Sequence, residues 1–257
     1  MQPVTFAQHR DKYWHRYANF KFSAGYHTVY IVASEISRAA LTMPLAFIRK
    51  GDGYTLCVVL SPTPEKNIYI APDGRWLGGY IPASVRSYPF SLEINADKDE
   101  TLCVDESSGL IQEGDTGKSI PLFDDSGKLS EAVQQVLNLL HQVEQNRVLT
   151  DQAVSVLSQA DVICEWDFKL TLNGVERSAS GLYRIDETRL SNLADPQFVQ
   201  LRQTGALKVA YAQLLSMGNI SKWARLAKMH NQSPSTSPAA SFSLGSDDMF
   251  QFGEGSD

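Results

Sequence analysis

The stretch DGRWLGGYIPASVRSYPF, residues 73–90, restricts the fold more than any other part of the chain. Its mixture of aromatic, glycine, proline and arginine residues is too irregular for a helix or an ordinary strand. Gly78 and Gly79 remove side chains where a backbone bends or approaches another group closely. Pro82 and Pro89 fix φ and lack an amide donor, which excludes an interior strand. The sequence therefore predicts a rigid loop that displays rings and a guanidinium.

Arg86 admits two interpretations. A guanidinium can stack on a ring while it donates hydrogen bonds to carbonyls or a carboxylate. In the first interpretation Arg86 is a buried clip and the aromatic residues are core. In the second, a peptide, partner protein or carboxylate is recognised by Trp76, Tyr80, Arg86, Tyr88 and Phe90. The peptide bond after Tyr88 precedes a proline, so both its cis and trans forms are open.

Composition and charge narrow the class of protein. The 257 residues are 43% hydrophobic and 20% charged, as in ordinary globular proteins. The net charge is −6, and four of these negative charges come from acids after Lys228, beyond which there is no Lys or Arg. The remainder is close to neutral, which argues against nucleic-acid binding because phosphates require a basic surface.

The chain carries no signal for export or membrane insertion. Its amino terminus lacks the apolar core of a secretory signal, and no run approaches the roughly 18 apolar residues of a transmembrane helix. Cys57, Cys103 and Cys164 are odd in number and far apart, as expected for reduced, buried thiols. We expect a cytoplasmic protein.

The first half of the chain predicts strands separated by turns. Residues 54–60 are nearly all apolar and predict a central strand covered on both faces. A short helix is expected over 34–41, with Ser34 as N-cap and Glu35 in its first turn. The predicted strands are 27–33, 45–49, 54–60, 67–70 and 101–104.

The second half predicts helices and a hairpin. Apolar spacing predicts a helix from residue 129, and Thr150 is expected to cap a second one. Residues 163–172 alternate in polarity and lead through Asn173-Gly174, a strong hairpin signal, into the extended run 175–185. Further helices are expected from about 186, 196 and 205. The last should place on one stripe Leu207, Tyr211, Leu214 and Leu215.

These elements predict a single α+β domain over residues 1–230. A mixed, mostly antiparallel sheet from the first half and the later hairpin should pack against the C-terminal helices. Residues 231–257 are rich in Ser, Pro and acids and are expected to be a disordered tail. Phe250 and Phe252 lie among acids there and resemble a short docking motif, with an inert tail as the alternative.

The sequence shows no recognisable reaction centre. The run from Gly114 to Ser119 resembles a phosphate-binding loop, but Gln112 stands where that pattern needs glycine. The chain lacks a nucleophile elbow and a zinc-binding helix motif, and His9 and His15 lie in a basic, aromatic run without metal-ligand spacing. We expect no cofactor and no metal.

Residues 73–90 resemble the SapC family of bacterial proteins, and further matches extend this resemblance over about residues 4–225. Among them are the stretches 43–47, 121–124, 181–186 and 211–219. The resemblance implies an association with TonB-dependent receptors, flavin-dependent tryptophan halogenases and cupin-like hydroxylases. It implies no catalytic residues.

Two functions from different classes follow. The favoured one is a non-catalytic binding or accessory protein that recognises a protein or peptide partner through residues 73–90, with the tail as a second contact. The alternative is an enzyme acting on a peptide or a small carboxylate-bearing metabolite, with Arg86 binding the carboxylate. His15 or Glu35 would then be the acid/base, which must lie within hydrogen-bond reach of the substrate.

Overall fold

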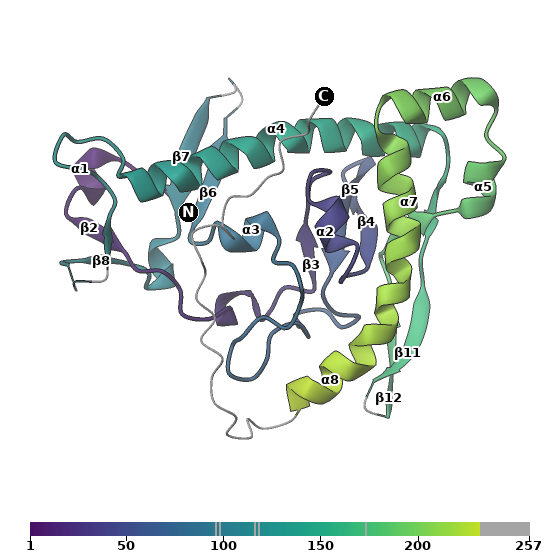
Figure 1. Cartoon of the computed structure of the whole chain (residues 1–257), viewed down its shortest axis with the longest axis horizontal. Coiled ribbons are helices and arrows are strands. Elements are labelled where there is room, and N and C mark those ends of the chain that lie inside the picture. Colours follow the sequence, from purple (N-terminus) through teal and green to yellow (C-terminus); the bar gives the residue numbers. More distant parts are fainter. Residues whose placement is uncertain (96, 98, 116, 118, 173, 232–257) are drawn as a thin grey trace.

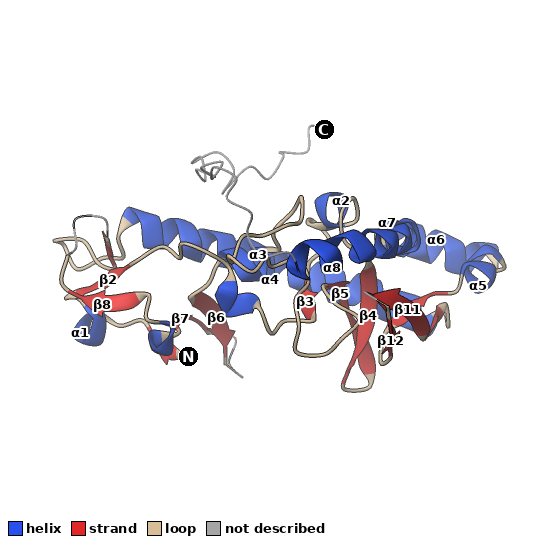
Figure 2. Cartoon of the chain, turned by 90° about the horizontal axis from the view of Figure 1, so that it is seen from below, coloured by secondary structure: helices blue, strands red, loops and turns tan. Residues whose placement is uncertain are grey.

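The computed structural model describes residues 1–231 except 96, 98, 116, 118 and 173. The molecule is elongated, and its longest helix, α4 (Glu131–Gln159), runs along its length (Figure 1). The long helices form one layer and most strands lie on one side of it (Figure 2). Mixed helices and antiparallel sheets confirm the predicted α+β class. The predicted tail from residue 232 lies outside the described residues.

A five-stranded antiparallel sheet, in the order β10-β13-β4-β5-β3, is the centre of the fold. β5 is an interior strand, and residues 56–60 are at most 1% exposed. A strand covered on both faces must be apolar throughout, so the prediction for this run is confirmed. The strands are β3 (Thr28–Tyr30), β4 (Leu45–Lys50), β5 (Gly53–Val59), β10 (Ile163–Glu165) and β13 (Tyr183–Ile185).

Three smaller antiparallel sheets flank the central one, in the orders β1-β7-β6, β8-β2-β9 and β11-β12. The last is the predicted hairpin, in which Leu172 pairs with Val175 and Gly174 has a φ of 78°. It forms a sheet of its own. The strands are β1 (Gln2–Pro3), β2 (Lys12–Trp14), β6 (Phe90–Ile94), β7 (Glu100–Val104), β8 (Ile111–Glu113), β9 (Ile120–Pro121), β11 (Phe168–Leu172) and β12 (Val175–Ala179).

The remaining helices are short. Helices that begin near residues 186, 196 and 205 agree with the predicted positions. Within the described residues, no helix combines the length and apolar character needed to cross a membrane. The α-helices are α1 (Phe6–His9), α2 (Ile36–Ala39), α3 (Ala83–Arg86), α5 (Glu187–Ser191), α6 (Asp195–Gln203), α7 (Ala206–Ser216) and α8 (Trp223–Asn231), and the 3₁₀ turns are η1 (Lys21–Ser23), η2 (Glu106–Ser108) and η3 (Met217–Lys222).

Helix α4 joins two hydrophobic core clusters. Its first half contributes residues between 133 and 140 to a cluster with Trp14 and Phe90. Its second half contributes residues between 153 and 157 to the larger cluster around the central sheet. Because buried apolar area is the main favourable term in folding, α4 is held at both ends by tertiary packing.

The predicted second helix at Thr150 is wrong, because α4 continues through that position. The Thr150 hydroxyl donates to the carbonyl of Asn146, one turn earlier in the same helix, at 2.6 Å. It accepts a hydrogen bond from the amide of Ala33 at 2.8 Å. Thr150 therefore satisfies a backbone group of the sheet region instead of capping a new helix.

The stripe predicted for α7 includes solvent-facing side chains, since Tyr211 is 47% and Leu215 81% exposed. The buried face carries small residues and Gln213. The Gln213 amide donates to the carbonyl of Leu45 at 3.1 Å and accepts from the amide of Ile185 at 2.9 Å. Small side chains let α7 lie close to β4 and β13, where Gln213 bonds to backbone groups of both strands.

Two further predictions need correction. Residues 67–70 form a turn, because the Asn67 side chain accepts from the amide of Tyr69 and donates to the carbonyl of Ser23. Such local bonds compete with strand pairing. The helix expected over 34–41 is limited to α2, and Glu35, not Ser34, precedes its first residue.

Replacing Thr150 by Val should lower the free energy of unfolding by about 1–3 kcal/mol, because the amide of Ala33 loses its acceptor away from water. Urea denaturation measures this change. Thr204→Val is the matched control, since the exposed Thr204 hydroxyl bonds only within its own helix among the described residues. Equal effects of the two substitutions would contradict the assigned role.

Candidate functional site

The loop 73–90 folds through close approaches that only glycine permits. A Cβ at Gly78 would lie 2.7 Å from Nε1 of Trp76, and one at Gly79 would lie 2.8 Å from Cγ2 of Thr42. Real Cβ atoms do not come that near to another heavy atom. The loop then enters the short helix α3 and leaves it through a cis peptide bond between Tyr88 and Pro89. The irregular loop expected from the sequence is therefore present.

Aromatic rings pack along this loop. Nε1 of Trp76 donates to the carbonyl of Tyr80 at 2.8 Å, which closes the segment that contains both glycines. The Trp76 ring lies 5.7 Å from that of Phe20, edge to face. Tyr88 stacks on Phe22 with ring centroids 4.2 Å apart and planes 11° apart. Trp76, Tyr80 and Tyr88 are all half-buried, so each contributes both to packing and to the surface.

A buried carboxylate joins the loop to the segment between β3 and α2. Glu35 is only 2% exposed, and its Oε1 accepts from the Tyr80 hydroxyl and the Ala83 amide, both at 2.8 Å. Its Oε2 accepts from the amide of Val32 at 3.0 Å. A carboxylate in such a position is stable only when donors surround it. Glu35 thus joins the segment before α2 to both ends of the turn that leads into α3.

Arg86 also contacts Tyr80. Its Nη2 lies 3.5 Å from the Tyr80 hydroxyl, and its Cζ lies 5.8 Å from the centroid of that ring. The Tyr17 hydroxyl donates to the Arg86 carbonyl at 3.5 Å. Burial raises the pKa of Tyr80, as does Glu35, while Arg86 lowers it. Arg86 as a whole residue is half-buried, and its Nε is buried, so part of its side chain lies within the loop packing.

Tyr88 and Phe90 connect the loop to the smaller core cluster. The Tyr88 hydroxyl donates to Oδ2 of Asp105 at 3.0 Å. The Phe90 ring is 3% exposed and lies 5.0 Å from Trp14, edge to face. Phe90 therefore supports the loop from beneath. We define the aromatic/Arg surface as the half-buried side chains Tyr17, Phe22, Trp76, Tyr80, Arg86 and Tyr88.

The two alternative acid/base residues, His15 and Glu35, are held by different neighbours. Glu35 has both oxygens engaged in the bonds described above. His15 follows β2, and its amide donates to the carbonyl of Leu110 at 2.8 Å. Hydrogen bonds from Ser119 lower the pKa of Asp115, and the nearby His15 adds to that effect. No contact between described residues joins His15 to Glu35.

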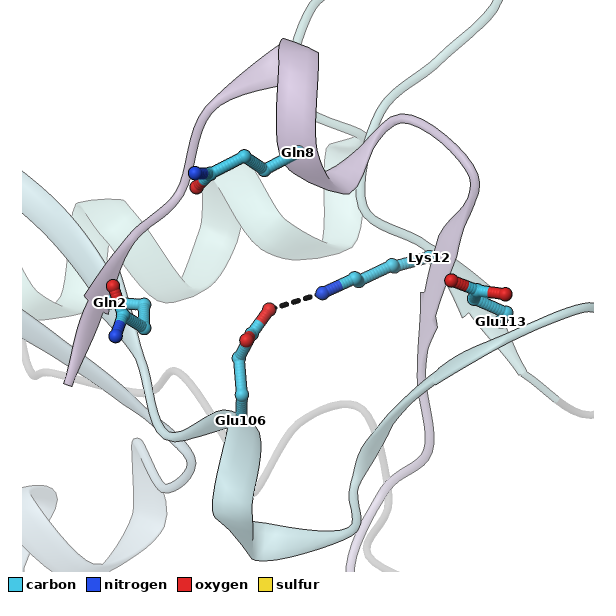
Figure 3. A pocket seen from close by; sticks show the side chains of 5 residues that line it. All are labelled: Gln2, Gln8, Lys12, Glu106 and Glu113. Carbon is cyan, nitrogen blue, oxygen red and sulfur yellow. Dashed lines mark hydrogen bonds and ion pairs between the residues drawn. The ribbon is translucent and has the colours of Figure 1, made fainter.

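A polar cavity of about 490 Å³ lies elsewhere, between the amino-terminal segment and η2 (Figure 3). It is lined by Gln2, Gln8, Lys12, Glu106 and Glu113. The amine of Lys12 donates to Glu106, and Nε2 of the buried His9 lies 3.2 Å from the same carboxylate oxygen. No sequence pattern pointed to this cavity, because Lys12 and Glu106 are 94 positions apart.

The two tail residues singled out from the sequence, Phe250 and Phe252, lie outside the described residues. Among the described residues, no group of three His, Cys, Asp or Glu side chains is arranged to hold a metal ion.

The fold and the site define an α+β protein with a ring-lined loop held over a buried carboxylate. The chain belongs to the SapC family, whose sequence model matches residues 4–223. The resemblance seen in the sequence is therefore confirmed. No curated protein and no solved structure matches the chain.

Replacing Glu35 by Gln should lower the free energy of unfolding by about 2–4 kcal/mol, because an amide nitrogen would face donors that now bind a carboxylate. Urea denaturation followed by tryptophan fluorescence measures this loss. Glu165→Gln, at an exposed position of β10, is the control and should change little. A neutral effect at Glu35 would show that its bonds do not hold the loop.

The tyrosines of the aromatic/Arg surface should lose their hydroxyl protons at a higher pH than tyrosines of the unfolded chain. Burial raises the pKa of Tyr17 and Tyr80, and burial together with the bond to Asp105 raises the pKa of Tyr88 to about 12. Since these values exceed the ordinary pKa of about 10, the phenols stabilise the fold below pH 10 and lose that effect as the pH rises toward 12.

Phenolate absorbance of the folded protein should therefore lag behind that of the protein unfolded in guanidinium as the pH is raised. Tyr80→Phe should remove part of the lag. Coincident titration curves for the folded and unfolded chain would contradict the burial of these hydroxyl groups.

Proposed function

We propose that the chain is a non-catalytic binding or accessory protein that recognises a protein or peptide partner through the aromatic/Arg surface. The observation that carries this proposal is the bond set of Glu35, which holds Tyr80 and the start of α3 in one conformation. A surface that is already ordered loses little conformational entropy when a partner binds. Trp76, Arg86 and Tyr88 belong to the residue types that dominate binding energy at protein interfaces.

The kind of partner follows from the chemistry of this surface. Half-buried rings provide apolar contact area, and their hydroxyl groups and the guanidinium provide directional donors. An extended peptide or loop with an apolar side chain beside a carboxylate meets both requirements. The carboxylate would lie against Arg86, and the apolar side chain would lie against Tyr88 and Phe22, whose rings are stacked.

Family membership and composition add to the proposal. The SapC resemblance points to partners in TonB-dependent receptor, tryptophan halogenase and cupin-like hydroxylase systems. The cysteines Cys57, Cys103 and Cys164 are all free, which is in keeping with a reducing compartment, and we propose the cytoplasm as the location.

Affinity capture with the full chain, Arg86→Ala and Tyr88→Ala tests the proposal. Captured proteins are then purified and titrated against each variant by calorimetry. Each substitution should weaken binding at least tenfold, about 1.4 kcal/mol, because hot-spot side chains typically contribute that much or more. Arg202→Ala, an exposed arginine on α6, is the matched control and should bind as the parent chain does.

Circular dichroism of each variant separates loss of binding from loss of fold. A partner that binds the parent, Arg86→Ala and Tyr88→Ala chains equally would remove the aromatic/Arg surface as the recognition site. Turnover of a peptide or carboxylate-bearing metabolite by the purified chain, abolished by Arg86→Ala, would instead establish the enzyme alternative.

A further inference from the structure

Exposed apolar side chains remain on the α2–α7 side of the molecule. Leu215 is 81% and Leu41 72% exposed, the two highest values among large hydrophobic side chains of the described residues. Tyr211, 47% exposed, lies one turn before Leu215, so these two share a helix face, while Leu207, one turn earlier, is partly buried against the core. Scattered exposed apolar residues are normal, but a continuous strip indicates a contact site.

Leu41 lies beside this strip through backbone contacts. The amine of Lys222 donates to the Leu41 carbonyl at 2.8 Å. The side-chain amide of Asn219, which lies one turn after Leu215, donates to the carbonyl of Ala40 at 2.7 Å. The end of α2 is therefore fixed against the end of α7. We define the α7 surface as the exposed residues Leu41, Lys208, Tyr211, Leu215 and Lys222.

Charge is segregated along the last part of the chain. Residues 205–230 contain no Asp or Glu but carry exposed Lys208, Lys222, Arg225 and Lys228. Residues 231–257 contain no Lys or Arg but carry Asp247, Asp248, Glu254 and Asp257. A basic, apolar helix face is thus followed by an acidic segment that contains Met249, Phe250 and Phe252. Opposite charges and matching apolar groups are the two requirements of a docking pair.

We propose that the segment 246–254, with the sequence SDDMFQFGE, binds to the α7 surface of its own chain. Phe250 and Phe252 cover Tyr211 and Leu215, and the aspartates at 247 and 248 lie toward the lysines of the strip. This contact gives the two phenylalanines a partner within the molecule.

The connecting length suits an intramolecular contact. Helix α8 has nine residues and is about 13 Å long, so the strip begins about that far from residue 231. A flexible linker of the length of residues 232–245 averages about 20 Å end to end. When linker length matches the distance to be spanned, the effective concentration reaches the millimolar range. A contact with millimolar intrinsic affinity would then be substantially occupied, and a second copy would compete only at similar concentrations.

Photo-crosslinking in the full chain tests the proposal. A photoreactive benzoylphenylalanine replaces Phe250, the protein is illuminated at low micromolar concentration, and mass spectrometry locates the adducts. The expected product has the mass of one chain and its adducts lie at Leu41 or within 207–222. Leu215→Ser and Lys208→Glu should each lower its yield at least fivefold, and high salt should lower it as well.

Leu149→Ser is the matched control, because Leu149 is 61% exposed on α4, outside the strip. This substitution should leave the yield unchanged, and circular dichroism should show all three variants folded. A product with the mass of two chains would assign the surface to a second copy and overturn the proposal. Adducts within 73–90, adducts that Leu215→Ser does not reduce, or no adduct at all would overturn it equally.

Discussion

The buried carboxylate of Glu35 is the interaction on which the site depends. It accepts hydrogen bonds from Val32, Tyr80 and Ala83, which come from two segments far apart in the sequence. Its charge is tolerated at 2% exposure only because donors surround both oxygens. In return, the irregular part of the loop before α3 is tied to one position. The conformation of the aromatic/Arg surface therefore depends on the hydrogen bonds that Glu35 accepts beneath it.

The aromatic/Arg surface and the core are not separable in this molecule. Trp76 and Tyr80 pack against the larger core cluster, while Phe90 is part of the smaller one. The loop 73–90 thus lies over the junction between the two clusters and contributes to both. A contact at the surface and the packing of the interior act on the same side chains. The packing of the loop corresponds to the first interpretation of Arg86 drawn from the sequence, and recognition of a partner, the second, stays a proposal.

Local signals predicted much of the fold. The apolar run of β5 and the Asn-Gly hairpin depend on neighbouring residues, and the glycine pair at 78 and 79 correctly indicated close approach. Errors arose where a distant partner decided the outcome. Thr150 binds Ala33 across 117 positions, and Gln213 binds Leu45 across 168. The Glu35 bonds span 45 and 48 positions, so its hydrogen-bond partners could not be read from the neighbouring sequence.

The length of α4 has a geometric consequence. The helix presents one set of side chains to the smaller cluster and another to the larger one, and residues 141–152 lie between them. Each residue added there would rotate one set by about 100° relative to the other, because an α-helix has 3.6 residues per turn. Only insertions near whole numbers of turns, such as seven or eleven residues, would keep both sets in phase. The helical repeat therefore limits which changes in the spacing between the two clusters the fold can accept.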